Sequence, residues 1–476
     1  MEEKKKLEFY GGEWISVLPF IIFIVLIILT TFFWQSISDG ALWVPAFVAL
    51  LLPFFLAKDK KQYADTIIEG MSSKDAITPV VCWIFAGVFS RILRMSGLAN
   101  GIAGLCASFG LGPTAFAVVT FLGSALFATA SGTGFGTIAA GMGVLYPAGV
   151  SLGADPALLA GVIISGAAFG DNLAPISDTT IVSATSQGVD VPGVVKTRFK
   201  YAIIGGLLTI LCIIVWGLTH TENVTAATGT YEYNPITLIM LIPVAITIFI
   251  AIKTGDIIIA TTWGSVLGII FACVFGMFDF IQVDVAEPEV PAVIGVHGDA
   301  AALDRVVDGV LYTGINSMLQ VIVLALLLFG SINILRQGGG DLKILNALEG
   351  IARGPKSAEF TVSTMVIVLS GIMGLNAPAI MAVGNSFAKP LAEKYDISPY
   401  RMANVMDAQS NTLGYTMPWT PAIIYTMSFA LDTSAPLTGL QILPCCFHCF
   451  TMCLVMFVTT CTGFGRHDDP YAKASK

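Results

Sequence analysis

The stretch that decides the fold is Phe169-Gly170-Asp171-Asn172-Leu173-Ala174-Pro175-Ile176-Ser177-Asp178-Thr179-Thr180, which puts two carboxylates and a proline inside an apolar segment. In a membrane, one charged Asp near the bilayer centre costs about 2.5 to 3.5 kcal/mol on insertion scales. We therefore expect the segment to face a cavity or a bound cation instead of acyl chains. Function is expected there first.

The composition places this stretch in a membrane. Hydrophobic residues make up 55% of the 476 residues, and charged residues make up 12%. Apolar runs such as 14–34 and 201–217 approach the roughly 20 residues that span the hydrocarbon of a bilayer. The first run is too long for the apolar part of a secretory signal, so we expect a retained helix. The sequence predicts an all-α polytopic membrane protein with about 12 to 14 transmembrane segments.

The charge of each loop predicts the topology. Basic segments are predicted to be cytoplasmic under the positive-inside rule: the N-terminus, 58–74, 196–200, 336–356 and the C-terminal tail. Segments without a single Lys or Arg are predicted to be external: 220–234, 279–304 and 432–438. Both termini are therefore expected in the cytoplasm.

An internal repeat is visible in the prolines. Three prolines have partners 243 residues later (390 minus 147): Pro147 with Pro390, Pro156 with Pro399, and Pro175 with Pro418. The order of a long helix, a turn rich in Gly or Asn and a proline-interrupted helix also recurs. The alternative is chance, because prolines are common in membrane helices.

The repeat predicts five parts: N-terminal transmembrane helices (1–64), a first repeat (65–190), linking transmembrane helices (191–303), a second repeat (304–432), and a C-terminal transmembrane helix with a tail (433–476). The first repeat follows a cytoplasmic loop and the second follows an external loop, so we expect opposite orientations. Inverted repeats with broken helices or re-entrant hairpins are typical of secondary transporters, whose sites form near the bilayer midplane.

The first break is predicted at residues 171–177. Pro175 removes a backbone donor there, and Gly170 with Asn172 weakens the helix before it. Unwound carbonyls, the end of a half-helix and carboxylates are suitable ligands for a hard monovalent cation.

The ion-binding residues predicted at this break are Asp171, Asn172, Ser177, Asp178 and Thr179, with Na+ held by Asp171 and Asp178. A carboxyl in a low-dielectric site is either protonated or neutralised by a bound cation, as exchange requires, and Asp171 is the better candidate. Its alternative role is a hydrogen bond to its own unwound backbone. Asp178 alternatively caps the second half-helix.

The second break is predicted at residues 411–421, where acids are absent and neutral oxygens remain. Asp407 lies one turn before Asn411, and either binds an ion or pairs with Arg401. The turns at 131–136 and 374–378 either complete the site or allow close helix packing. The predicted substrate-binding residues are Thr133, Asn376, Asp407, Asn411, Thr416, Trp419 and Thr420.

Motifs of other function classes are missing from the sequence. It has no HExxH, no G-x-S-x-G elbow, no P-loop lysine and no dinucleotide-binding glycine spacing. We therefore expect no enzyme, no cofactor other than Na+ as a coupling or transported ion, and no nucleic-acid partner.

Residues 170–180 resemble the signature G-D-K-x-S-P-x-S-D-T-T of the NhaC family of sodium/proton antiporters. The repeat arrangement over residues 65–432 is similar to the wider ion-transporter superfamily. The resemblance implies a carrier in the inner membrane of a bacterium and a homodimer with elevator-like movement. It also implies an ion or substrate site that includes Asp171, Ser177, Asp178, Thr179 and Thr180.

This sequence departs from the signature at Asn172, where the family commonly has Lys, and at Ala174, where it has Ser. A lysine would compete with Na+ for the carboxylate, so its absence favours a site that holds Na+ without obligatory proton exchange.

Two functions are therefore carried forward. The first is Na+/H+ antiport, with Asp171 binding a proton and Na+ in turn. The second is Na+-coupled transport or exchange of a small amino acid or carboxylate, whose carboxylate would lie at the N-terminus of a half-helix. The inverted repeats disfavour a third class, a channel or scaffold without coupling.

Overall fold

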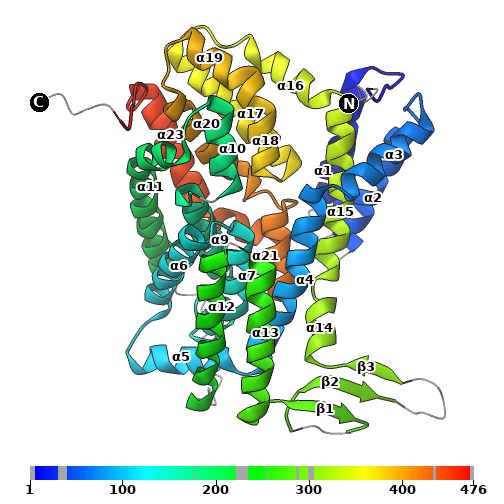
Figure 1. The fold of residues 1–476 in the computed structure, drawn as a ribbon, viewed down its shortest axis with the longest axis vertical. Helices are drawn as coiled ribbons and strands as arrows, with labels where there is room; N and C mark the ends of the chain where they lie inside the picture. The colour runs from blue at the N-terminus through cyan, green and yellow to red at the C-terminus, as the bar shows by residue number, and fades with distance from the viewer. Residues whose placement is uncertain are drawn as a thin grey trace, which may run out of the picture.

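A computed structural model describes residues 6–30, 40–175, 177–220, 234–254, 256–285, 289–298, 305–431 and 436–471. The regular structure of this part is mostly helical, and many helices run roughly along the long axis of the molecule, as Figure 1 shows. In chain order the elements are η1 (Glu13–Val17), α1 (Leu18–Ile28), α2 (Gly40–Phe54), α3 (Lys60–Met71), α4 (Lys74–Met95), α5 (Leu98–Ser108), α6 (Pro113–Ser131), α7 (Gly134–Ala140), η3 (Gly141–Leu145), α8 (Tyr146–Ser151), α9 (Pro156–Leu173), α10 (Asp178–Gln187), α11 (Val191–Thr219), η5 (Pro235–Met240), α12 (Leu241–Thr254), α13 (Ile257–Val274), β1 (Asp279–Val283), β2 (Ala292–His297), β3 (Val306–Asp308), α14 (Val310–Asn316), α15 (Leu319–Gln337), α16 (Gly340–Glu349), α17 (Pro355–Met373), α18 (Asn376–Val383), η6 (Gly384–Ala388), α19 (Lys389–Lys394), α20 (Pro399–Gly414), α21 (Pro421–Leu431), α22 (Gly439–Ile442), η7 (Leu443–Cys445) and α23 (Phe447–Thr462).

Six helical segments in the described ranges are long and apolar enough to cross a membrane: Ala76–Met95, Pro113–Ser131, Pro156–Gln187, Val191–Thr219, Ile257–Val274 and Pro355–Met373. Two helix pairs, bent by 63° and 48°, raise the count to eight if each pair forms one span. The prediction of a polytopic helical membrane protein with broken helices is confirmed. The predicted total of about 12 to 14 crossings is larger than length and composition support here and stays a prediction.

The elements of the two predicted repeats recur at nearly constant spacing. α9 and α20 begin 243 residues apart (399 minus 156), and so do α10 and α21 (421 minus 178). The segments η3 and η6 also begin 243 residues apart (384 minus 141), and both are π-helices, which are rare and often lie at functional sites. This recurrence supports a duplication, whereas the boundaries of the five parts and the opposite orientation of the repeats stay predictions.

A three-stranded sheet follows α13, where the sequence predicts only an acidic external loop. The pairing of β1 with β2 is parallel, and the pairing of β2 with β3 is antiparallel. Val occurs in all three strands and Ile in β1 and β2, and β-branched residues favour extended backbone. In Figure 1 the sheet lies at the end of the molecule opposite to α16, α17 and α19.

The broken span Pro156–Gln187 lies in the protein interior. Of its most apolar part, 89% is buried, compared with 28% for Val191–Thr219. α9 packs so closely on α6 that a Cβ added at Gly170 would lie 2.3 Å from the Cβ of Ala128. Small residues allow such close approach between membrane helices. Asp171 therefore faces protein, as a carboxylate within a membrane requires, whereas Asp178 is exposed.

Candidate functional site

The predicted break between two half-helices is present. α9 ends at Leu173, Ala174 is extended, and α10 begins at Asp178, while Ile176 lies outside the described residues. The last carbonyls of a helix have no partner within it, and they carry the negative end of the helix dipole. Asp171 lies in this last turn, so its carboxylate adds to a region that already attracts cations.

The Asp171 side chain is only 3% exposed and is surrounded by hydroxyl groups. Ser177 Oγ donates a hydrogen bond to Oδ1 at 2.7 Å. Thr179 Oγ1 and the Tyr415 hydroxyl lie 3.5 and 3.4 Å from Oδ2. In the described part of the chain, no Lys or Arg donates a hydrogen bond to this carboxylate. Its charge is therefore not neutralised by a direct ion pair.

Tyr415 connects Asp171 to the turn predicted at residues 131–136. A Cβ added at Gly134 would lie 2.0 Å from the Tyr415 hydroxyl oxygen, so only glycine allows this approach. The neighbouring Thr133 caps α7, because its Oγ1 accepts a hydrogen bond from the Gly136 N–H at 3.2 Å. The turn thus lies beside the site, while the Thr133 side chain serves the local backbone.

Three predicted residues form a chain of buried amides across the two repeats. Asn376 Nδ2 donates to Asn411 Oδ1, and Asn411 Nδ2 donates to Asn172 Oδ1 at 2.9 Å. The ends of this chain, Asn172 Nδ2 and Asn376 Oδ1, have no hydrogen-bond partner among the described residues. A buried donor and a buried acceptor without partners are unusual in a folded protein.

Asp407 does not pair with Arg401, so that alternative is wrong. Arg401 Nη2 instead bonds to Glu359 Oε2 at 3.0 Å, in a pair with no exposure. Residues 401 and 407 are six positions apart on α20 and point to different faces of the helix. Asp407 Oδ2 pairs with Arg198 Nη1, and both side chains are fully buried.

Arg198 is a site residue that the sequence does not predict, because together with Lys196 and Lys200 it has the pattern of a basic cytoplasmic loop. It lies on the buried face of α11, together with Val194 and Tyr201. The sequence does contain one signal for this burial: Arg198 lies four residues after Val194 and three residues before Tyr201, which is the spacing of residues on one helix face. The guanidinium therefore belongs to the interior.

The other predicted residues hydrogen-bond to backbone groups of the protein. Asp178 is exposed at the first position of α10, where its Oδ1 accepts from the Thr179 N–H at 2.9 Å. Thr416 and Thr420 each donate to a backbone carbonyl three or four residues earlier, and Trp419 Nε1 donates to the Gly371 carbonyl at 2.7 Å. Ion or substrate binding by these residues stays a prediction.

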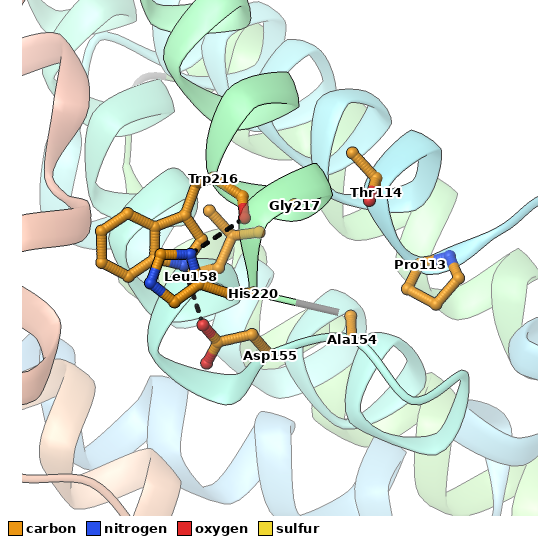
Figure 2. Close-up of a pocket in the computed structure, with 8 residues that line it drawn as sticks. All are labelled: Pro113, Thr114, Ala154, Asp155, Leu158, Trp216, Gly217 and His220. Atoms are coloured by element: carbon orange, nitrogen blue, oxygen red, sulfur yellow. Dashed lines mark hydrogen bonds between the residues drawn. The ribbon is translucent and has the colours of Figure 1, made fainter. Parts of the chain in front are cut away.

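A pocket of about 250 Å³ lies at the other end of α9, lined by Pro113, Thr114, Ala154, Asp155, Leu158, Trp216, Gly217 and His220 (Figure 2). Trp216 Nε1 donates to Asp155 Oδ2 at 2.9 Å, and the His220 ring stacks on Trp216 with ring centroids 4.1 Å apart. At 1.5 Å per residue along α9, Asp155 is about 24 Å from Asp171. The pocket is therefore separate from the carboxylate at the break.

A family model described as "Na+/H+ antiporter family" matches residues 10–218 and 207–461. The chain is 27% identical over 272 residues to a malate-2H+/Na+-lactate antiporter of Bacillus subtilis (strain 168), covering 54% of this chain and 56% of that protein. It therefore spans little more than half the length of that relative.

Two further relatives are covered more fully. The Na+/H+ antiporter NhaC of Alkalihalophilus pseudofirmus is 21% identical over 403 residues, with 83% of this chain and 84% of that protein covered. The arginine/ornithine antiporter ArcD of Halobacterium salinarum is 26% identical over 338 residues, covering 67% and 66%. Among solved structures, the YdaH transporter of Alcanivorax borkumensis covers 94% of this chain and 99% of that one at 14% identity, with a TM-score of 0.42.

Proposed function

Since the chain belongs to the Na+/H+ antiporter family, we propose that it exchanges Na+ for H+ across a membrane and that Asp171 binds the two ions in turn. The resemblance of residues 170–180 to that family is confirmed by the match along the chain. The protein is a secondary transporter and not an enzyme.

The observation that carries the proposal is the environment of Asp171. Its carboxylate is buried at the end of a half-helix and receives hydrogen bonds from hydroxyl groups alone within the described chain. A buried charge without a partner is costly, so the carboxyl must be neutralised by a bound cation or by a proton. One Na+ ion or one proton is enough to neutralise the carboxylate, so the two ions can replace each other at this position.

Ser177 and Thr179 are suited to both states of the site. A hydroxyl group donates one hydrogen bond and also has lone pairs, so it can donate to a carboxylate or turn an oxygen toward Na+. With Na+ bound, the cation would lie between the Asp171 carboxylate and these oxygens. With H+ bound, the neutral carboxyl would keep hydrogen bonds to the same groups. Movement of one repeat against the other would then expose the site to each side of the membrane in turn.

A second candidate function is favoured by the amide chain of Asn172, Asn411 and Asn376. Its unpartnered donor and acceptor would suit a small amino acid or carboxylate that is moved together with Na+ or exchanged for it. The names of the malate/lactate and arginine/ornithine relatives agree with this class of solute.

We further propose a location in the inner membrane of a bacterium, cytoplasmic termini and a homodimer. The apolar helices and the family support a multi-pass membrane protein. The finer assignments rest on the loop charges and on the resemblance to the sodium/proton antiporters.

Flux measurements test the two functions against each other. Purified protein is placed in proteoliposomes that contain a pH-sensitive dye, and a Na+ gradient is imposed with no organic solute present. Antiport predicts a change of internal pH under this condition. If the vesicles take up labelled arginine, ornithine, malate or lactate but show no proton flux when the organic solute is left out, antiport is refuted and the second function is supported.

Asp171→Asn tests the site. The variant keeps the size of the side chain but cannot carry the charge, so Na+-dependent proton movement should be lost. Asp59→Asn is the matched control, since Asp59 is an exposed cap of α3 and Asn caps a helix about as well as Asp. Wild-type flux in Asp171→Asn would show that another group carries the ions.

A further inference from the structure

The guanidinium of Arg198 is surrounded by four oxygens. Nη1 donates to the Asn172 carbonyl at 2.7 Å, to Thr180 Oγ1 at 3.1 Å and to Asp407 Oδ2. Nε donates to Asn404 Oδ1 at 2.9 Å. The oxygens come from α9, α10 and α20, whereas Arg198 comes from α11. We call these four groups the oxygen cage.

The cage has the composition of a monovalent-cation site. It combines a carboxylate, an amide oxygen, a hydroxyl and a backbone carbonyl from the last turn of a half-helix. Hard cations take oxygen ligands of these kinds, and carbonyls at the C-terminal ends of broken helices bind Na+ in transporters.

The fit between the guanidinium and the cage is incomplete. Arg198 Nη2 and Asp407 Oδ1 are buried and have no hydrogen-bond partner within the described ranges. The usual strong pairing of Arg with a carboxylate is bidentate and uses both oxygens and two nitrogens. Here the single nitrogen Nη1 meets three of the four oxygens, as a point cation would.

The cage adjoins the Asp171 site. Asn172 directly follows Asp171, and Thr180 Oγ1 lies 3.5 Å from the Asp171 carbonyl oxygen. The two positions thus share the break between α9 and α10. Two buried carboxylates lie there, and only Asp407 has a direct ion pair among the described residues.

We propose that Arg198 is a tethered cation that fills a second monovalent-cation position, made by the oxygen cage, beside the exchangeable position at Asp171. The inference rests on the proposed function, because it assumes that Asp171 holds Na+. One cation of the pair is then exchanged in each cycle, and the other is part of the protein. Removal of the guanidinium opens the second position to Na+.

The number of bound Na+ ions tests the proposal. Equilibrium binding of radioactive Na+ to the purified full chain should give one ion per chain for the wild type and none for Asp171→Asn. Arg198→Gln should bind two, and Asp171→Asn with Arg198→Gln should bind one, at the cage alone. Adding Asp407→Asn to Arg198→Gln should return the count to one. If Arg198→Gln leaves the number of bound Na+ ions unchanged both in the wild type and in Asp171→Asn, the proposal that Arg198 is a tethered cation is overturned.

Failure of the proposed function would give a different result. A wild type that binds no Na+, or an Asp171→Asn variant that still binds one ion, contradicts the assignment of Asp171. The additional Na+ ion bound by Arg198→Gln would still test the oxygen cage independently. If Arg198→Gln does not fold in choline buffer, Na+ or millimolar guanidinium should restore a monodisperse, folded protein by filling the cage. Recovery by neither ion would also overturn the proposal.

Discussion

Replacing Asp407 by Asn is expected to destabilise the protein severely without changing the shape of the side chain. Asp407 and Arg198 are both fully buried, and the carboxylate is the one acid that hydrogen-bonds this guanidinium in the described chain. Removing one partner of a buried ion pair costs about 3 to 5 kcal/mol, because an uncompensated charge remains. Three neutral oxygens still face Arg198, so we expect a loss near the lower limit, about 3 kcal/mol.

The double variant Asp407→Asn with Arg198→Gln is expected to restore stability. It removes both charges, so no uncompensated buried charge remains, and most of the lost free energy of unfolding should return. The coupling between the two positions then measures the pair itself. Unfolding would be followed by titration with SDS in mixed micelles, using helicity as the signal.

Asp59→Asn again serves as the control, because it changes the same chemical group at an exposed cap. Its free energy of unfolding should stay within about 0.5 kcal/mol of the wild type. A loss of that small size in Asp407→Asn, or a double variant no more stable than the single one, would refute the buried ion pair.

Three further predictions follow from the contacts. Gly134→Ala should lower transport and cost about 1 to 3 kcal/mol of stability, because its Cβ would lie 2.0 Å from the Tyr415 hydroxyl; flux and unfolding measurements check this. Glu359→Gln should cost about 3 to 5 kcal/mol in the SDS titration, because it leaves a fully buried guanidinium without a carboxylate. Hydrogen bonds, first from the Tyr471 hydroxyl, lower the pKa of the exposed Asp190 to about 2. Because this pKa is lower than the value of about 3.9 for Asp in the unfolded chain, the ionised carboxylate stabilises the folded state at pH values above about 3.9, and this stabilisation is lost as the pH falls through about 2. The difference in free energy of unfolding between wild type and Tyr471→Phe should therefore be constant above about pH 5 and shrink toward pH 2.

The break and the hydroxyl groups that contact Asp171 could be predicted because local chemistry decides them. Pro175 cannot donate a backbone hydrogen bond, so the helix ends near it whatever its neighbours are. Ser177 and Thr179 reach Asp171 across a short turn, which the sequence spacing already limits. The matching proline in the second half predicted which segment would face this one, and Asn411 indeed contacts Asn172.

The charged half of the interior could not be predicted in the same way. Lys196, Arg198 and Lys200 have the same formal charge and are close in sequence. A helix places Lys196 and Lys200 on one face and Arg198 on the opposite face, and only tertiary packing decides which face is buried. The pairing of Asp407 joins residues 209 positions apart, and no local rule selects this partner. The small sheet after α13 was missed because its strands are short and lie in an acidic segment.

Where the antiporter signature commonly has a lysine, this chain has Asn172, and a buried arginine of α11 lies beside it. The Arg198 guanidinium contacts the Asn172 carbonyl, but it pairs with Asp407 and makes no hydrogen bond to Asp171. Among the groups of this site, the buried carboxylates of Asp171 and Asp407 and the buried guanidinium of Arg198 leave a single negative charge in the interior, because Asp178 is exposed. One proton or one Na+ balances that charge in a low-dielectric interior. We therefore expect H+ and Na+ to exclude each other at Asp171, and whether the absence of a lysine at residue 172 uncouples Na+ binding from proton exchange stays a prediction.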